Sequence, residues 1–364
     1  MIPVYQPHIG ENEKKYVLDA VESTWVSSRG EYLDRFESGF AEYVGAQNGI
    51  ATCNGTVSLH LVLVALGVGP GDEVIVPTLT YVASVNAIAY TGATPVFVDC
   101  HPDYWNLDPE LIEERITANT KAIMVVHLYG HPADMDPIME ISRTHGIPVI
   151  EDAAEAHGAE YRGRRVGCFG LAGSYSFFGN KIITTGEGGM VVTSDAHFAG
   201  VCRHLRGQGV SPTRTYWHDV VGFNYRMTNI AAALGCAQLE RIQSTISRKR
   251  EIAKRYEAAL GGLRGIVLQT EMPWATSVYW MVSILVENGL RDEMMLHLRS
   301  NGVETRPFFY PAHTLPMYDR GEAFPVSERV AAAGVNLPSF PDLTDDEVDS
   351  ICRLVERFAE DRLS

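Results

Sequence analysis

The chain has 364 residues, of which 46% are hydrophobic and 21% are charged, and this composition is typical of a soluble globular protein. Its 45 acidic and 30 basic residues give a net charge of −15, which argues against nonspecific binding to nucleic acid or to an anionic membrane. This length exceeds what one hydrophobic core usually supports, so we expect a large domain and a smaller one.

The sequence carries no sign of export or of a metal site. The N-terminus has neither a basic stretch nor the apolar run of a secretory signal, and no apolar run approaches the roughly 20 residues of a membrane span. The six cysteines are scattered without a C-x-x-C spacing, which fits reduced thiols better than a disulfide framework or a zinc site. We therefore expect a cytoplasmic protein that binds no metal.

Helical and strand patterns alternate through the first half of the chain. Apolar residues at helical spacing predict helices over 11–22, 32–43, 57–66, 108–116 and 137–145. Short apolar runs predict buried strands over 73–77, 94–99, 122–127, 148–151 and 189–193. Strands that alternate with helices predict an α/β fold with a mostly parallel central sheet covered on both faces.

The second half of the chain predicts a change of architecture. An amphipathic stretch over 228–260 is expected to be a helix that crosses from the large domain into the small one. A strand over 279–286 and a closing helix over 345–363 then indicate a smaller C-terminal α+β domain. We place the large domain, with an N-terminal segment, at residues 1–245 and the small domain at residues 246–364.

Two segments next to predicted strands and helices can bind parts of a ligand. Gly55 and Thr56 precede the predicted helix 57–66 and present N–H groups and a hydroxyl that can bind an anion, although Thr56 could simply cap the helix. Tyr81 follows a strand, at the edge of the sheet where α/β proteins bind ligands. It can present a flat face to a planar ring, or it can simply pack against its neighbours.

Two carboxylates follow the strand 148–151. Asp152 ends this strand at the same edge of the sheet, where its carboxylate could keep a pyridine nitrogen protonated and make the ring an electron sink. Glu155 lies three residues further on and could reach a ring hydroxyl. The alternative is that Asp152 only caps a helix.

Lys181 lies between an aromatic segment and a glycine-rich turn. Residues 175–178 are typical of a short buried strand, and a lysine beside such an aromatic wall can form a Schiff base with an aldehyde. The alternative is an ordinary solvated lysine at a strand end. Ser176 adds a further phosphate donor. Phosphate donors, a ring stacker, a ring-nitrogen acid and an amine nucleophile, in this order, together indicate a pyridoxal 5′-phosphate site.

These segments, with 186–189 and 222–227, resemble the DegT/StrS family of nucleotide-sugar aminotransferases. The resemblance implies the type I (aspartate aminotransferase-like) fold, pyridoxal 5′-phosphate as cofactor, and a homodimer with shared active sites. It also implies residue roles: Gly55, Thr56 and Ser176 hold the cofactor phosphate, Tyr81 stacks on the ring, Asp152 meets the ring nitrogen, Glu155 lies near the ring hydroxyl, Lys181 binds the cofactor aldehyde, and Asn224 reaches the phosphate of the neighbouring subunit. Many members have glutamine at the position of Glu155.

The expected substrate also comes from resemblance. Segments at 4–7, 23–28, 80–86, 127–132, 216–219 and 304–310 are similar to those of members that aminate C4 of GDP-4-keto-6-deoxy-D-mannose for surface polysaccharide (O-antigen), with L-glutamate as donor. A UDP- or dTDP-linked keto-deoxy sugar, aminated at C4 or C3, is the alternative. A sugar dehydratase of this family has histidine at the lysine position, so Lys181 argues against it. A cofactor-binding regulator is the least supported, because no DNA-binding module is appended.

Substrate contacts are expected from several separate segments. Arg248 and its basic neighbours could bind a pyrophosphate, for which arginine is well shaped, or form a solvated helix face. Trp25 and Tyr310 are candidates for the wall against the C6 methyl group of the sugar. By resemblance, Ser27 lies in a substrate-facing segment and His313 lies near the substrate, although a lone histidine in an aromatic loop can be structural. Trp217 and His218 could line the cleft from the partner subunit.

Overall fold

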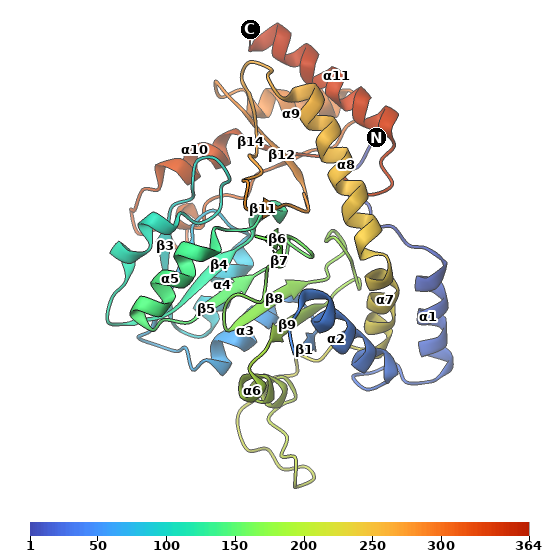
Figure 1. Ribbon diagram of the computed structural model, residues 1–364, viewed down its shortest axis with the longest axis vertical. Coiled ribbons are helices and arrows are strands. Elements are labelled where there is room, and N and C mark those ends of the chain that lie inside the picture. Colours follow the sequence, from blue (N-terminus) through green and yellow to red (C-terminus); the bar gives the residue numbers. More distant parts are fainter. Residues whose placement is uncertain (364) are drawn as a thin grey trace.

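The computed structural model describes residues 1–363, and its centre is a seven-stranded sheet with the strand order β1-β9-β8-β5-β4-β2-β3. All of these strands run parallel except β9, which is antiparallel to both of its neighbours. The strands of the sheet are β1 (Asn48–Thr52), β2 (Glu73–Pro77), β3 (Thr94–Val98), β4 (Thr120–Val126), β5 (Val149–Asp152), β8 (Ala172–Ser176) and β9 (Gly189–Thr193). The predicted α/β fold with a mostly parallel sheet is confirmed (Figure 1).

Alternation along the buried strands explains why both faces of the sheet are covered. In β4, Ala122 and Met124 belong to one hydrophobic cluster, whereas Ile123 and Val125 belong to another. Successive side chains of a strand point to opposite faces, so a continuous apolar run serves two cores. The helices of this part are α1 (Glu11–Glu22), α2 (Glu31–Val44), α3 (Gly55–Ala65), α4 (Val82–Tyr90), α5 (Met135–His145), α6 (Ala196–Arg206) and α7 (Asn229–Glu240). Helices α2, α5 and α7 supply buried residues to one core, and α3, α4 and α6 to the other.

The last third of the chain builds a second, antiparallel sheet with the order β10-β12-β14-β13. Its strands and helices are α8 (Ile242–Leu260), β10 (Ile266–Leu268), β12 (Val282–Val286), α9 (Arg291–Ser300), β13 (Arg306–Pro307), α10 (Pro325–Ala333), β14 (Gly334–Leu337) and α11 (Asp345–Arg362). A small third sheet contains β6 (Glu160–Tyr161), β7 (Arg164–Arg165) and β11 (Ala275–Thr276). The position 245/246 lies in the first turns of α8, and the division of the chain there stays a prediction.

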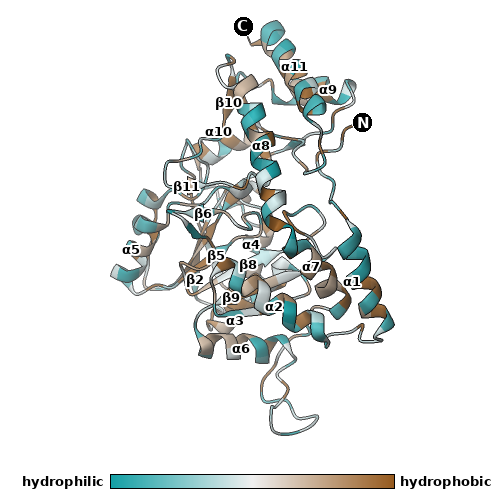
Figure 2. Cartoon of the chain, turned by 45° about the vertical axis from the view of Figure 1, so that its right-hand side comes forward, coloured by the Kyte–Doolittle hydropathy of each residue, from teal (hydrophilic) through white to brown (hydrophobic). Residues whose placement is uncertain are grey.

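Both ends of the described chain lie beside this second sheet (Figure 1). Ile2 forms a parallel bridge with Val303, so the N-terminal segment is held by the C-terminal third. Figure 2 shows many hydrophilic residues on α1, α5 and α11 at the outside of the molecule. Within residues 1–363 there is no helix that is long and apolar enough to cross a membrane.

Four predicted elements differ in the structure. The strand predicted over 175–178 lies at Ala172–Ser176, and Phe178 beyond it is 47% exposed. The stretch 228–260 is not one helix, because Arg241 leaves the helical conformation (φ −109°, ψ 2°) and separates α7 from α8. The stretch 108–116 contains two short 3₁₀ helices, η1 (Pro109–Leu111) and η2 (Glu113–Arg115), in place of an α-helix. The strand predicted over 279–286 begins at Val282, since Tyr279 has a left-handed conformation (φ 46°) that a strand does not accept.

A long segment between α6 and α7 projects away from the body of the molecule (Figure 1). Short backbone bridges hold it together, between Gly207 and Asn224 and between Val210 and His218. Two large apolar side chains in it are almost completely exposed, Tyr216 at 94% and Val221 at 90%. We call residues 207–226 the arm.

Candidate active site

A cavity of about 650 Å³ opens where the parallel strands end at their carboxyl side. One wall comes from the segments that follow β1, β2, β5 and β8, and the other comes from the C-terminal third. Seven of the predicted cofactor-binding residues line it: Gly55, Thr56, Tyr81, Asp152, Glu155, Ser176 and Lys181. The fold therefore brings together residues that are up to 126 positions apart in the sequence, because each follows a strand that ends at the same edge of the sheet.

The N-terminus of α3 forms an anion-binding cradle at one end of this cavity. Asn54 caps the helix, and its side-chain oxygen accepts the N–H of Val57 at 3.0 Å. Thr56 is inside the first turn, so the interpretation of Thr56 as the helix cap is wrong. A Cβ atom at Gly55 would lie 2.7 Å from Cβ of Ser176, so only glycine lets the helix approach Ser176 so closely. First-turn N–H groups beside two hydroxyls suit a phosphate group.

Asp152 is buried at the end of β5 and is held from two sides. Oδ2 accepts the hydroxyl of Ser84 at 2.7 Å, and Oδ1 accepts the N–H of Ala154 at 3.1 Å. Burial raises the pKa of Asp152, and these two hydrogen bonds oppose that rise by stabilising the charged form. No α-helix begins directly after Asp152, where the chain forms a turn, so the alternative of a helix cap is wrong; its carboxylate caps only this turn.

Lys181 is withdrawn from solvent, with 8% of its surface exposed. Its Nζ lies 3.4 Å from Oε1 of Glu155 and 4.0 Å from the ring centroid of Trp280. Oε2 of Glu155 accepts the N–H of Tyr129 at 2.9 Å. Burial raises the pKa of Glu155 to about 7, and the charge of Lys181 works against that rise. The alternative of an ordinary solvated lysine is therefore wrong.

This set of residues fits pyridoxal 5′-phosphate. It offers an amine for the aldehyde, a buried carboxylate for the ring nitrogen and a glycine-dependent cradle for the phosphate. Tyr81 precedes α4, is 54% exposed and lies with its ring centroid 5.3 Å from that of Phe309, so its ring is available at the cavity wall. Among residues 1–363 no cluster of histidine, cysteine or carboxylate side chains could hold a metal ion.

Four predicted residues lie outside this cavity but remain accessible at the surface. Trp25 is 57% exposed, and its carbonyl accepts a hydrogen bond from Asn229 at 2.8 Å. Ser27 is on the same exposed segment, and Tyr310 is 66% exposed. Asn224 is in the arm, where its side chain accepts the Nε–H of Arg226 at 3.0 Å. The structure of one chain does not bring these four residues to Lys181.

Two residues predicted to contact the substrate have other partners in the structure. The guanidinium of Arg248 donates to the carbonyl of Leu343 at 2.6 Å and to Asp345 at 2.8 Å, so it joins α8 to the start of α11 and does not line the cavity. His313 is buried, with Nδ1 2.7 Å from the hydroxyl of Thr78 and Nε2 3.1 Å from Glu328. These contacts therefore favour a structural role for His313 over contact with the substrate.

The basic neighbours of Arg248 are also engaged. Lys249 is fully buried, donates to the carbonyl of Ser339 at 2.5 Å, and has its pKa lowered to about 7 by burial. Arg250 pairs with Glu271 at 2.6 Å. The sequence Arg248-Lys249-Arg250 therefore holds the C-terminal third together and does not form a free cationic patch.

Among the residues that sequence reasoning missed, Trp280, Arg306 and Asn336 line the cavity, and Ser84 is buried behind it against Asp152. Ser84 stands two positions after the start of α4, where a serine carries no distinctive signal. Trp280 precedes β12, and its indole N–H donates to the carbonyl of Asn180 at 2.6 Å. Trp280 and Asn180 are 100 positions apart in the sequence, so no local sequence pattern predicts this contact.

Three comparisons place the chain among known proteins. The model of the DegT/DnrJ/EryC1/StrS aminotransferase family matches residues 7–356. GDP-perosamine synthase of Escherichia coli O157:H7 is 52% identical over 363 residues, which cover 99% of each chain. The aminotransferase TlmJ from Streptoalloteichus hindustanus superposes over 100% of both chains with a TM-score of 0.96 and 33% identity. The PLP form of Spr1654 from Streptococcus pneumoniae covers 99% of both chains, with a TM-score of 0.94 and 28% identity.

Proposed function

The chain belongs to the DegT/DnrJ/EryC1/StrS aminotransferase family, and on that premise we propose that it aminates C4 of GDP-4-keto-6-deoxy-D-mannose to form GDP-perosamine. It is an aminotransferase that uses pyridoxal 5′-phosphate. The observation that carries the proposal is the meeting of Lys181, Asp152 and the α3 cradle in one cavity, in a chain 52% identical to a GDP-perosamine synthase. L-Glutamate is the proposed donor.

The roles of the residues follow from their contacts. When bound, pyridoxal 5′-phosphate supplies an aldehyde carbon that exchanges amines and a ring that accepts an electron pair. Gly55, Thr56 and Ser176 would hold its phosphate, and Asp152 would keep a proton on its ring nitrogen. Lys181 would hold the aldehyde carbon and, once released, would carry a proton to and from the reacting carbon. Trp280 and Glu155 would keep the freed amine at that carbon.

The sugar substrate gives the first prediction. With glutamate as donor, we expect GDP-4-keto-6-deoxy-D-mannose to turn over with a higher kcat/KM than UDP- or dTDP-linked 4-keto or 3-keto sugars. The base and the sugar configuration together must select the substrate, because pyrophosphate is common to all of them. Products identified by mass spectrometry and NMR would test this. A higher kcat/KM for a UDP- or dTDP-linked sugar would overturn the substrate while leaving the aminotransferase activity intact.

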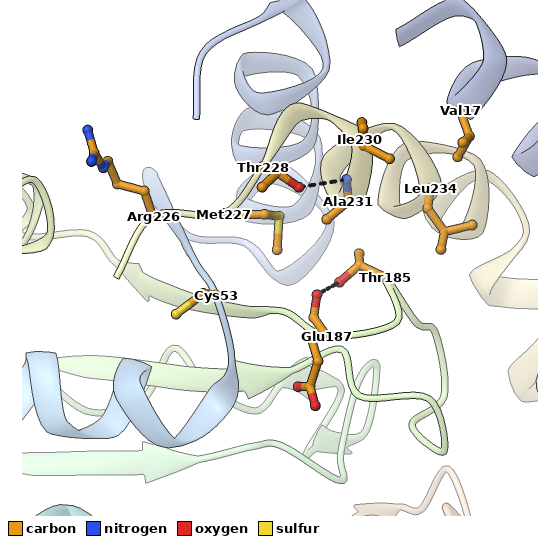
Figure 3. A pocket seen from close by; sticks show the side chains of 10 residues that line it. All are labelled: Val17, Cys53, Thr185, Glu187, Arg226, Met227, Thr228, Ile230, Ala231 and Leu234. Atoms are coloured by element: carbon orange, nitrogen blue, oxygen red, sulfur yellow. Dashed lines mark hydrogen bonds between the residues drawn. The ribbon is translucent and has the colours of Figure 1, made fainter. Parts of the chain in front are cut away.

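We infer that the enzyme is a homodimer with shared active sites. Large apolar side chains are exposed at the end of α1 and just after it, including Leu18, Val21 and Trp25, as well as in the arm. A second pocket of about 440 Å³ lies beside them (Figure 3), lined by Val17 of α1 and the first half of α7. Glu187 lines both this pocket and the main cavity. A second copy that covers this surface would also complete the active site.

Asn224 makes the shared site testable. If it reaches the phosphate bound by the partner subunit, a homodimer of either variant, Lys181→Ala or Asn224→Ala, has two defective active sites. In a mixed dimer both substitutions fall in one site, so the other site is intact. In an equal mixture after subunit exchange, about one quarter of the sites should be intact, so about one quarter of wild-type activity should return. Sedimentation of the same samples checks assembly. A fully active monomer, or no recovery on mixing, would contradict the shared site.

We infer that the enzyme works in the bacterial cytoplasm, because the proposed product is an amino-dideoxy sugar nucleotide for O-antigen. All six cysteines are free thiols in the structure, and this supports a reducing compartment.

A further inference from the structure

Lys181 lies on a loop and not on a strand or a helix. Residues 179–185, between β8 and β9, form a turn, bends and irregular backbone. The N–H of Lys181 donates to the carbonyl of Phe178 at 2.9 Å, and the N–H of Thr185 donates to the carbonyl of Phe177 at 2.9 Å. We call residues 179–185 the lysine loop. Such a loop needs contacts from other parts of the chain to fix its backbone.

Two side chains from distant parts of the chain hold the lysine loop. The hydroxyl of Tyr5 donates a hydrogen bond to the backbone carbonyl of Lys181 itself. The indole N–H of Trp280 donates to the carbonyl of Asn180 at 2.6 Å. The N-terminal segment and the C-terminal third therefore bind the carbonyls of two consecutive residues. Because the backbone position of Lys181 decides where its Nζ can reach, the bond from Tyr5 helps to fix the position of the amine.

The segment that carries Tyr5 is itself held on both sides of this residue. The N–H of Val4 donates to the carboxylate of Glu304 at 3.1 Å, and Nδ1 of His8 lies 2.6 Å from Oδ1 of Asp342. Both carboxylates belong to the C-terminal third. Burial raises the pKa of the Tyr5 phenol, so this group keeps its proton at neutral pH and remains a donor.

The same segment supports the lysine loop by a second route. The side-chain amide of Gln238 in α7 donates to the carbonyl of His8 at 2.9 Å and to Glu13 at 2.6 Å. Its oxygen accepts the N–H of Thr184 at 3.3 Å. Gln238 is buried, so these bonds are shielded from water. The N-terminal segment therefore contacts the lysine loop directly at Lys181 and, through Gln238, at Thr184.

Tyr5 is not among the residues that line the active-site cavity. A residue outside the cavity wall contacts neither the cofactor nor a substrate bound there, so its effect on the reaction passes through Lys181. In the proposed function Lys181 moves a proton in both half-reactions, first when the donor gives up its amine and then when the sugar receives it. A displaced amine would slow both steps without weakening the binding of either substrate.

We propose that Tyr5 is a positioning residue for this reaction, in which its hydroxyl holds the backbone carbonyl of Lys181 so that the amine stays at the reacting carbon. The proposal rests on the role given to Lys181 in the proposed function, and it adds the part of the chain that keeps this lysine in place. The N-terminal segment then contributes to the rate of the reaction as well as to the packing of the C-terminal third.

Rates and affinities measured separately in the two half-reactions test this role. Tyr5→Phe keeps the ring and removes only the hydroxyl. The pyridoxal form is mixed with L-glutamate and the pyridoxamine form with the sugar nucleotide, and cofactor absorbance is followed. At saturation both rate constants should fall about threefold to tenfold, as expected for the loss of one hydrogen bond. The apparent Kd of each substrate should stay within about twofold of the wild-type value, because Tyr5 contacts neither.

A second measurement needs no bound cofactor. In the cofactor-free protein, hydrogen–deuterium exchange of the peptide that contains the lysine loop should be about threefold to tenfold faster in Tyr5→Phe than in the wild type. Tyr256→Phe is the matched control, because Tyr256 is buried and its hydroxyl also donates to a backbone carbonyl, that of Pro338 at 3.0 Å. The control should lose a similar amount of thermal stability but keep both rate constants and the exchange rate of the lysine loop.

Unchanged rate constants in Tyr5→Phe would overturn the proposal. A raised Kd with an unchanged rate at saturation would also overturn it, because that result indicates contact with a ligand. Equal losses in Tyr256→Phe would do the same, since they would reflect a general loss of stability. If the wild type reacts with neither substrate, the proposed function fails instead, and hydrogen exchange of the cofactor-free protein still decides whether Tyr5 holds the lysine loop.

Discussion

Replacement of Lys181 with alanine is expected to leave a folded protein that has lost multiple turnover, with a rate reduced at least about 10³-fold. Lys181 would be needed twice, as the amine that holds the cofactor and as the base that moves a proton at the reacting carbon. No other described lysine lines the cavity, so nothing replaces it. The fold should tolerate the change, because Glu155, with its pKa raised to about 7, can become neutral when its cationic partner is removed.

The assay should follow both turnover and the covalent link to the cofactor. Reduction with borohydride followed by peptide mass analysis should find pyridoxal phosphate on the peptide that contains Lys181 in the wild type and not in the variant. Lys254→Ala is the matched control, because Lys254 is exposed on α8 away from the cavity. Repeated turnover by Lys181→Ala would remove this residue from the mechanism.

The fold was largely predictable where one local pattern decides the structure. The helix Glu11–Glu22 and the strands Glu73–Pro77 and Gly189–Thr193 have the predicted bounds, because amphipathic spacing or an apolar run fixed them locally. The break at Arg241 was not predictable, since no glycine or proline marks it. It comes from tertiary packing, in which α7 packs on α1 and α2 while α8 extends to α11.

The residues of the active site also fall into a group that the sequence predicts and a group that it does not. Segments that follow strand ends could be placed at one edge of the sheet from the topology alone, and the cavity contains all seven of those cofactor candidates. Arg306 and Trp280 come from the C-terminal third, whose docking onto the large sheet no sequence periodicity specifies. The pairing of Arg248 was not predictable for a related reason: a run of basic residues does not reveal which acids, here Asp345 for Arg248 and Glu271 for Arg250, will pair with them.

Replacement of Asp152 with asparagine is expected to preserve the fold and to reduce turnover about 10²- to 10³-fold. Asparagine has nearly the same shape but no negative charge, so it cannot keep a proton on the ring nitrogen of the cofactor. The side chain keeps one oxygen to accept a hydrogen bond from Ser84 or from Ala154, so only one of the two present bonds is lost. The loss of one such bond costs about 1 kcal/mol, which a protein of this size should tolerate.

The variant Ser84→Ala separates the effect of a lost hydrogen bond to Asp152 from the effect of its lost charge. It removes the hydroxyl that donates to Oδ2 of Asp152 but leaves the carboxylate in place. If the negative charge is what matters, Ser84→Ala should lose far less activity than Asp152→Asn, while thermal unfolding of the two variants should be similar. Cofactor absorbance and turnover, measured on the same preparations, would separate poor binding from slow chemistry. Near-normal turnover of Asp152→Asn would mean that this carboxylate serves only the turn after β5, because the charge would then have no part in the reaction.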